Sequence, residues 1–183
     1  MSAKKGSRTE ERDRLAASLA SSLGGKGGGY QVSSAFSLPE RRRFLGLWSV
    51  VEHEVEGRDY LDIFAATALR GAALEDPAYI CSYDFRDSVC VKRVRIDGAA
   101  DLGGGKAEFS YRLSIAISWE IGKGVLVVRP ELGYQSTSLG GKPAAVGELA
   151  AQGEATRIAY RFEDGSLFLE EGGDRKRLVR GGG

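Results

Sequence analysis

The chain has 183 residues, enough for one domain of ordinary size or for one domain with a tail. Hydrophobic residues make up 42% and charged residues 28%, which is typical of a soluble globular chain and excludes a fully disordered one. The net charge of +1 gives no support for a nucleic acid as partner. Apolar runs fall well short of the roughly 20 residues that a membrane-spanning helix needs, so the chain is not expected to span a membrane.

Residues 1–36 are predicted to form a flexible N-terminal tail, and residues 37–183 one folded domain. Within the tail, Arg8–Leu23 fits an amphipathic helix with a narrow stripe of leucines. This stretch is either a segment without stable structure or a helix that docks a protein partner on a glycine tether. Met1–Lys5 lacks an apolar signal core. The protein is therefore expected in the cytoplasm, or in a targeted compartment such as the plastid or periplasm after removal of its targeting segment.

The folded domain is expected to begin with a short helix and a strand. Ser37–Glu40 fits a capping box at the start of a helix. Val51–Glu56 then alternates, with His53 on the apolar face and glutamates on the polar face, as in a half-buried strand. In Asp59–Glu75 the apolar residues recur at helical spacing, and Asp59 fits an N-cap. This stretch predicts one helix inserted after the first strand.

The most regular pattern runs from Ala107 to Pro130 and predicts a hairpin at the centre of the sheet. The apolar face of its first arm consists of Phe109, Tyr111, Leu113, Ile115, Ile117, Trp119 and Ile121. Gly122–Gly124 supplies a turn, and Val125–Val128 begins the return strand. Because the inward row carries more aromatic bulk than a thin two-layer core usually needs, the sheet is expected to curl around packed side chains or around a ligand.

The flanking stretches predict the other strands. Tyr79–Phe85 and Val89–Ile96 read as a strand pair, and Arg175–Arg180 as a final short strand that is basic on its outer face. Asp97–Lys106 is a glycine-rich loop. Tyr134–Gly153 indicates one weak strand or an irregular crossover.

The Asp164–Gly165 pair predicts a tight hairpin, because type I′ turns favour this dipeptide. Such a turn places Phe162 opposite Leu167 and Tyr160 opposite Leu169, so both strands share one apolar face. The total is about eight or nine antiparallel strands joined mostly by short turns. This predicts a mainly β fold, an antiparallel up-and-down barrel with one helix after the first strand, with a sandwich as the alternative.

Gly46-Leu47-Trp48 opens the first strand directly after the short helix, and the meander ends in a basic strand. In this pattern the domain resembles the lipocalin-like (calycin) β-barrel family. In that family an arginine from a late strand packs over the tryptophan of the Gly-x-Trp motif at the closed end. The resemblance implies this role for Arg177 or Arg180, acting on Trp48. The chain departs from typical lipocalins because it has no Thr-Asp-Tyr motif.

The candidate ligand-binding residues share an inward position in this barrel and are His53, Tyr111, Leu113, Ile115, Ile117, Trp119, Tyr160 and Phe162. They either line a pocket for a hydrophobic ligand or fill the core themselves, as in many small barrels. His53, the only histidine, is either a ligand or proton-transfer group or a structural hydrogen-bonding residue. Cys81 and Cys90 either form a disulfide or remain reduced thiols.

Known catalytic patterns do not occur in this sequence: it has no Gly-x-Ser-x-Gly, no Walker loop and no His/Cys set with metal-ligand spacing. No cofactor is assigned. The first hypothesis is that the barrel binds a hydrophobic small molecule of the fatty acid, isoprenoid or tetrapyrrole type. The alternative is an assembly factor or chaperone-type module with a filled barrel, acting through the N-terminal helix or through a basic end that combines Arg41–Arg43 with Arg175–Arg180. A third reading, implied by the resemblance, is a barrel isomerase or chromophore lyase using His53 or a buried tyrosine.

Overall fold

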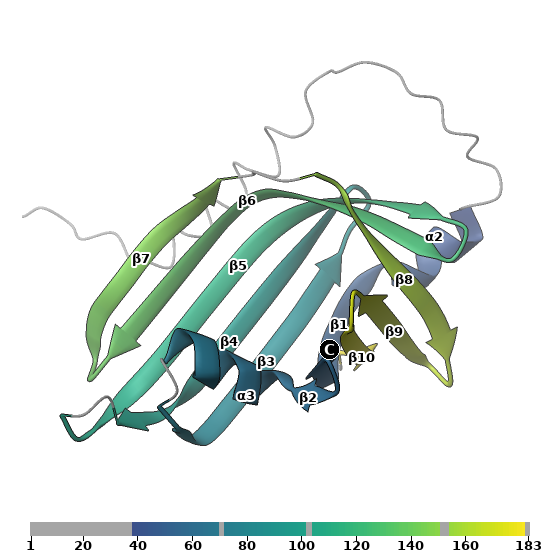
Figure 1. The fold of residues 1–183 in the computed structure, drawn as a ribbon. Helices are drawn as coiled ribbons and strands as arrows, with labels where there is room; N and C mark the ends of the chain where they lie inside the picture. The colour runs from purple at the N-terminus through teal and green to yellow at the C-terminus, as the bar shows by residue number, and fades with distance from the viewer. Residues whose placement is uncertain (1–37, 70–71, 102–103, 151–153, 182–183) are drawn as a thin grey trace, which may run out of the picture. The chain divides into compact units, whose positions relative to one another are not determined.

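Eight antiparallel strands form a closed up-and-down barrel in the computed structural model, in the order β1-β3-β4-β5-β6-β8-β9-β10 (Figure 1). The barrel closes because β10 pairs with β1 as well as with β9. The described residues are 38–69, 72–101, 104–150 and 154–181. They belong to the compact unit Phe36–Gly183, and the predicted tail with its Arg8–Leu23 helix lies outside them.

The described elements in chain order are α2 (Leu38–Phe44), β1 (Gly46–Val55), β2 (Arg58–Asp59), α3 (Tyr60–Ala68), β3 (Leu74–Phe85), β4 (Val89–Asp101), β5 (Lys106–Gly122), β6 (Val125–Leu139), β7 (Lys142–Ala150), β8 (Thr156–Glu163), β9 (Ser166–Glu171) and β10 (Asp174–Arg180). The mainly β fold with a helix after the first strand is therefore confirmed. Neither described helix is long and apolar enough to cross a membrane.

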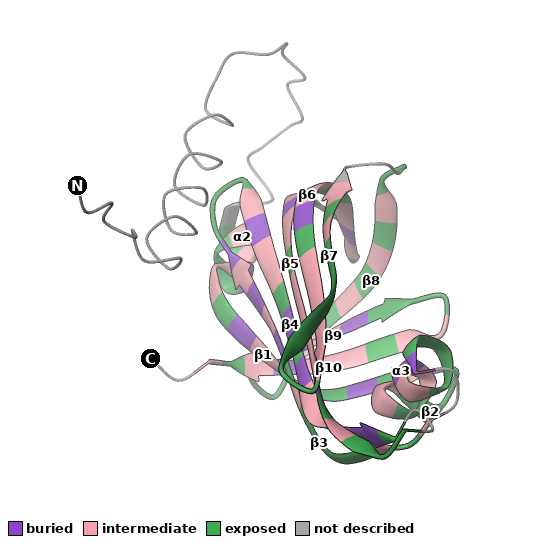
Figure 2. Cartoon of the chain, turned by 90° about the vertical axis from the view of Figure 1, so that its left-hand side faces the viewer, coloured by how far each residue is buried: buried purple, intermediate pink, exposed green. Residues whose placement is uncertain are grey.

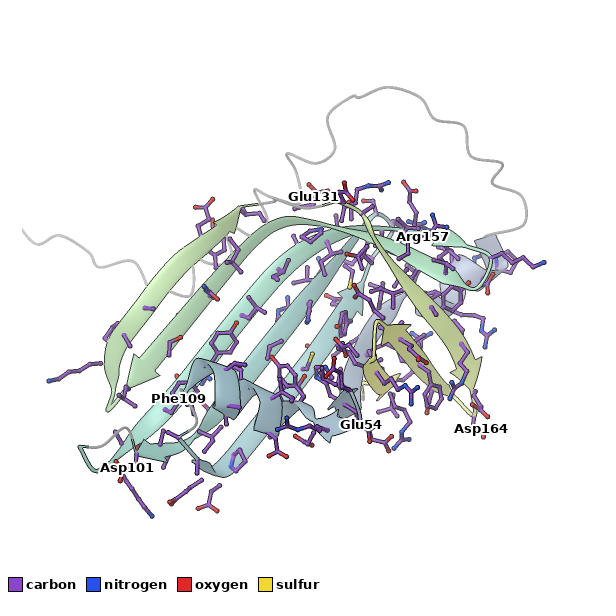
Figure 3. The ribbon with its side chains drawn as sticks, in the orientation of Figure 1. Glu54, Asp101, Phe109, Glu131, Arg157 and Asp164 are labelled. Carbon is purple, nitrogen blue, oxygen red and sulfur yellow. The ribbon has the colours of Figure 1, made fainter. Side chains whose placement is uncertain are left out.

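The β8–β9 hairpin has the register that its turn predicts. Phe162 pairs with Leu167, and Tyr160 pairs with Leu169. Asp164 and Gly165 both have positive φ, 47° and 76°, as a two-residue type I′ turn requires. Asp164 marks the tip of this hairpin, and Asp101 ends β4 at the opposite end of the molecule (Figure 3).

Several boundaries differ from the prediction. The strand predicted over Val89–Ile96 continues to Asp101 because it stays paired with β5, so Asp97–Asp101 of the predicted glycine-rich loop Asp97–Lys106 belongs to β4. The helix predicted over Asp59–Glu75 ends at Ala68, because the residues from Leu74 onward pair with β4 instead. The return strand of the central hairpin continues well past Val128 to Leu139. It passes Pro130 at a bulge, where a residue without a backbone N–H is tolerated. Within the predicted weak strand or crossover Tyr134–Gly153, the described residues supply the last part of β6 and all of β7.

One edge of β6 is shared by two strands. Val125–Val128 pairs with β8, which continues the barrel, whereas Leu132–Leu139 pairs with β7. In Figure 1, β7 accompanies the far half of β6 away from β8. The wall formed by β4, β5 and β6 therefore extends on one side beyond the ring of barrel strands.

A β-bulge in β1 sets which of its residues face inward. Val50 pairs with Leu178 and Glu52 with Arg177, so Val51 is an extra residue without a partner on β10. Val51 was expected on the inner face beside His53, but it lies outside and is 48% exposed. The bulge keeps Trp48, Val50 and His53 inside although they do not share one alternation.

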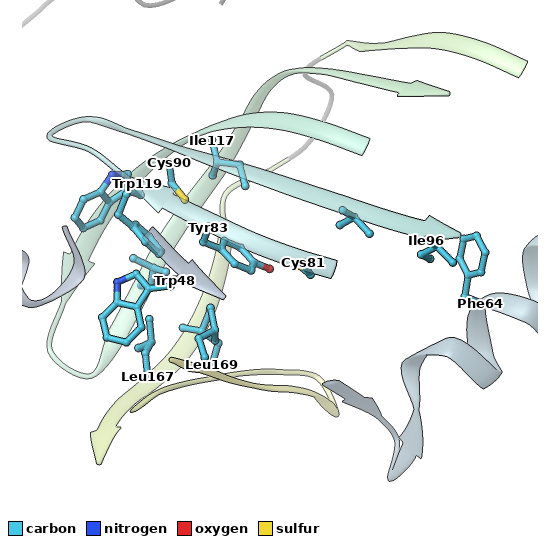
Figure 4. Close-up of a cluster of buried hydrophobic side chains, with 14 of the residues drawn as sticks. Trp48, Phe64, Cys81, Tyr83, Cys90, Ile96, Ile117, Trp119, Leu167 and Leu169 are labelled. Atoms are coloured by element: carbon cyan, nitrogen blue, oxygen red, sulfur yellow. The ribbon is translucent and has the colours of Figure 1, made fainter. Parts of the chain in front are cut away.

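Buried residues alternate with more exposed ones along the C-terminal part of β3 and within β4, as expected for strands with one inward face (Figure 2). The buried side chains join one hydrophobic core. In Figure 4, Trp48 and Trp119 lie at one end of this core, and Phe64 from α3 lies at the other. The two ends are built differently, and that difference locates the candidate site.

Candidate ligand-binding site

The end of the barrel that carries Trp119 is filled by its own aromatic side chains. Trp119 is 2% exposed and Ile117 is 9% exposed. The Phe44 ring from α2 lies 5.7 Å from Trp119 and 4.9 Å from each of Tyr160 and Phe162, between ring centroids. Three of the eight candidate ligand-binding residues therefore pack against Phe44 of α2, and a fourth, Ile117, is buried in the same core.

Arg180 closes the same end over Trp48. Its guanidinium carbon lies 4.3 Å from the centroid of the Trp48 ring, and it donates hydrogen bonds to the backbone oxygens of Arg43 and Leu45. Gly46 has a φ of +109°, and a Cβ there would lie 2.9 Å from Arg180 Nη1. Arg177 lies on the outer face instead, where it forms an ion pair of 2.5 Å with Glu52.

Cys81 and Cys90 are free thiols, both buried. Within the β3–β4 hairpin, Cys81 pairs with Val94, whereas Cys90 pairs with Phe85. The two cysteines are thus offset by four positions along the hairpin, about 13 Å of strand. That separation exceeds the reach of a disulfide, so the hairpin register does not join them.

The middle of the inward row on β5 is different from its ends. Tyr111, Leu113 and Ile115 are only half-buried, although Phe109 on one side and Ile117 on the other are buried. In this region β5 pairs with the half of β6 that carries β7 rather than β8. The inner face of the β4–β6 wall therefore presents accessible apolar surface here.

A polar cluster occupies the inner faces of β1, β3 and β10. His53 Nε2 lies 3.0 Å from Asp174 Oδ1, and His53 Nδ1 lies 2.7 Å from the Tyr79 hydroxyl. Asp174 is also ion-paired with Lys176. Since an ionised carboxylate only accepts hydrogen bonds, Nε2 of His53 carries the proton, and Nδ1 accepts from Tyr79.

Burial and this hydrogen-bond network together set the charges of the cluster. Burial lowers the pKa of His53, and the hydrogen bond to Asp174 offsets this only in part, so the imidazole is neutral at pH 7. Burial alone would raise the pKa of Asp174, but hydrogen bonds from His53 and Lys176 outweigh it and hold the pKa at about 2. Burial likewise lowers the pKa of Lys176, against the opposing effect of Asp174.

The helix α3 covers this cluster with aromatic rings. Tyr60 stacks on His53 at 4.1 Å between centroids, and Phe64 lies 5.3 Å from Tyr111. The rings of α3 therefore span from the histidine on β1 to the accessible row on β5. The N-terminus of α3 is fixed by Asp59, whose side chain accepts from Leu61 N at 2.7 Å.

A partly open pocket of about 230 Å³ lies between β1 and the start of α3. Its lining combines Val50, His53, Tyr60, Leu61 and Tyr79 with the exposed residues Val51, Glu52, Glu54 and Asp59. The pocket lies where the barrel wall is incomplete, because β1 pairs with β3 only from Gly46 to Ser49. The pocket therefore borders both the polar cluster and the inner end of α3.

Sequence reasoning placed His53 correctly on the inner face but missed its partners Tyr79 and Asp174, and it missed the two inward lysines, Lys92 and Lys176. Lys92 had a readable signal: it alternates in phase with Cys90, Val94 and Ile96, which form the apolar face of its strand. Asp174 had no such signal in the sequence, since its hydrogen bond with His53 joins residues that are 121 positions apart in the chain.

Because burial favours the neutral form of His53, we predict that this residue titrates at a lower pH than an exposed histidine. We expect its imidazole to titrate below the ordinary value of 6.5 in the folded protein, because burial disfavours the charged ring. As the unfolded chain then binds the proton more readily, the contribution of His53 to stability is fully present above pH 6.5 and is lost as the pH drops below it. NMR of the single histidine measures the midpoint directly. A midpoint above 6.5 would contradict burial as the dominant effect.

Within the parts of the chain that the structure describes, no group of His, Cys, Asp and Glu side chains is arranged to hold a metal ion. Comparisons of the chain with protein-family models, with curated proteins and with solved structures found no match.

Proposed function

We propose that the protein binds a hydrophobic small molecule inside the barrel, between the β4–β6 wall and α3. The observation that carries this proposal is the accessible apolar row of Tyr111, Leu113 and Ile115, which lies inside the fold between two buried residues. An inward apolar surface in partial contact with solvent is the usual property of a small-molecule site.

The position of α3 supports the same proposal. The helix contacts β1, β2 and β3, and its Phe64 reaches the β5 row across the end of the barrel. A short helix whose aromatic side chains reach across the end of the barrel suits the role of a lid over the bound molecule. The resemblance to the lipocalin-like family, whose members bind hydrophobic ligands in such barrels, is in agreement with this role.

The first test uses a neutral fluorescent hydrophobic probe, N-phenyl-1-naphthylamine, with the full chain. We expect saturable binding with increased fluorescence, and we expect Ile115→Trp to weaken it at least about tenfold by filling the accessible space. The matched control is Ser114→Trp, because Ser114 is the neighbouring residue on the outer face of β5 and is exposed. It should leave probe binding unchanged.

Native mass spectrometry of the purified protein complements the probe. Extra mass that disappears on denaturation identifies a co-purified ligand by class. Failure of the wild-type chain to take up the probe, together with a bare native mass, would refute interior binding. Equal probe affinity in Ile115→Trp and in the wild-type chain would place the binding site elsewhere.

A further inference from the structure

Lys92 points into the barrel. It lies on β4 between Cys90 and Val94, both buried, and it is itself half-buried. Its cross-strand neighbours are Tyr83 on β3 and Ile115 on β5. A lysine at such a position costs free energy unless its charge is paired, so its retention inside an apolar wall calls for an explanation.

The ammonium of Lys92 has no carboxylate partner within the described part of the chain. Its one described contact is with the ring of Tyr83, whose centroid lies 5.7 Å from Nζ. The inward carboxylate of the polar cluster, Asp174, already accepts from both His53 and Lys176. Two lysines and one carboxylate therefore leave one positive charge uncompensated at this site.

The two lysines face the same interior space. Burial is the main cause of the lowered pKa of Lys176 on β10 and of His53 on β1, and the charge of Lys92 adds to both shifts, in agreement with side chains that face one interior. Lys176 is held by Asp174 with 10% of its side chain exposed. Lys92, in contrast, is free to bind an incoming anion.

Apolar surface adjoins Lys92 directly. Ile115, its partner in the register, belongs to the accessible row, and the next inward pair is Val94 with Leu113. A molecule whose hydrophobic part lies along that row would bring one of its ends to the ammonium. A single negative charge on that end would match the single uncompensated positive charge.

We infer that the ligand is an elongated hydrophobic molecule ending in one carboxylate, and that Lys92 binds this carboxylate inside the barrel. The inference rests on the function proposed above and adds the chemical class of the ligand. The carboxylate forms a charge-assisted hydrogen bond with the Lys92 ammonium in a region of low dielectric, where such bonds are strong.

The test compares cis-parinaric acid with its methyl ester, because the two fluorescent probes differ in the carboxylate charge. We expect the wild-type chain to bind the acid about tenfold more tightly than the ester. In Lys92→Met we expect the affinity for the acid to fall about tenfold and that for the ester to stay unchanged. The control is Arg93→Met, which removes an exposed charge from the outer face of the same strand. It should alter neither affinity.

The remaining outcomes of this experiment would each contradict a different part of the inference. Equal wild-type affinities for the acid and the ester would overturn the carboxylate assignment and leave interior binding standing. Loss of both affinities in Lys92→Met, with native circular dichroism, would show a packing role instead of charge recognition. Lys92→Gln serves as a second neutral variant if the methionine variant misfolds. Failure of both probes to bind the wild-type chain would overturn this inference together with the proposed function.

Discussion

Trp119→Ala should destabilise the protein by about 3–5 kcal/mol, the loss typical of removing a large aromatic side chain from a packed core. Trp119 is 2% exposed, and its ring lies 5.2 Å from that of Phe85. Its Nε1 donates a hydrogen bond of 2.9 Å to the backbone oxygen of Arg86, and the Arg41 guanidinium lies 4.2 Å above the ring. The alanine variant loses all of these contacts and leaves a cavity in the closed aromatic core.

Urea unfolding measures this loss of stability. An unchanged slope of the unfolding free energy against urea concentration would indicate that both proteins unfold by the same reaction. Tyr134→Ala is a suitable control, because Tyr134 lies on β6 and is 41% exposed. Its expected effect is within about 0.5 kcal/mol. If Trp119→Ala behaved like the control, the aromatic end would not be the stable part of the barrel.

Asp174→Asn should destabilise the folded protein by about 3 kcal/mol at pH 7, the lower end of the range for removing one partner of a buried ion pair. The lower end applies because 34% of the Asp174 side chain is exposed, whereas the side chains of His53 and Lys176 are 5% and 10% exposed. The asparagine keeps the shape of the side chain but leaves the Lys176 ammonium without its counter-charge.

The loss should depend on pH. Because the folded pKa of Asp174 is about 2 against an ordinary value of 3.8, its stabilising contribution is present above pH 3.8 and is lost as the pH falls through 2. Urea unfolding of both proteins at several pH values measures the difference, which should narrow over that interval. Asp174→Asn combined with Lys176→Met should regain most of the loss, since the ammonium that Asp174 compensates is then removed as well.

An exposed pair provides the comparison for this experiment. Glu52→Gln removes the ion pair with Arg177 on the outer face of the same two strands. Its expected cost is much smaller than that of Asp174→Asn, because solvent screens an exposed pair. If Asp174→Asn cost no more than Glu52→Gln, the polar cluster would be solvated like the surface, and its role as a buried site would be refuted.

Local patterns in the sequence were sufficient for the fold class and for the turn between β8 and β9. The alternation over β5 and the Asp164–Gly165 dipeptide each determine which side chains share a face, and both concern residues close in the chain. The length of β6 was missed because Pro130 normally ends a strand. Only the bulge opposite Ala116 and Ile117 allows the strand to continue, and this irregularity has no simple sequence signal.

The candidate site was predictable only in part. His53 and the row of Tyr111, Leu113 and Ile115 follow from alternation along single strands. Alternation does not predict that this row stays accessible while the end of the barrel near Trp119 is filled. That difference depends on how α2 inserts Phe44 between β5 and β8. The partners of His53 come from β3, β10 and α3, which the chain brings together only when the barrel closes.

The single extra residue in β1 has a consequence for how this barrel tolerates insertions and deletions. Removing the codon for Val51 would leave every other described pair between β1 and β10 intact, because Val51 has no partner there. The strand would lose the bend that accompanies the bulge at the point where it parts from β3. A deletion of one residue at this point would therefore change the course of β1 without shifting its register against β10, and His53 would stay opposite Lys176.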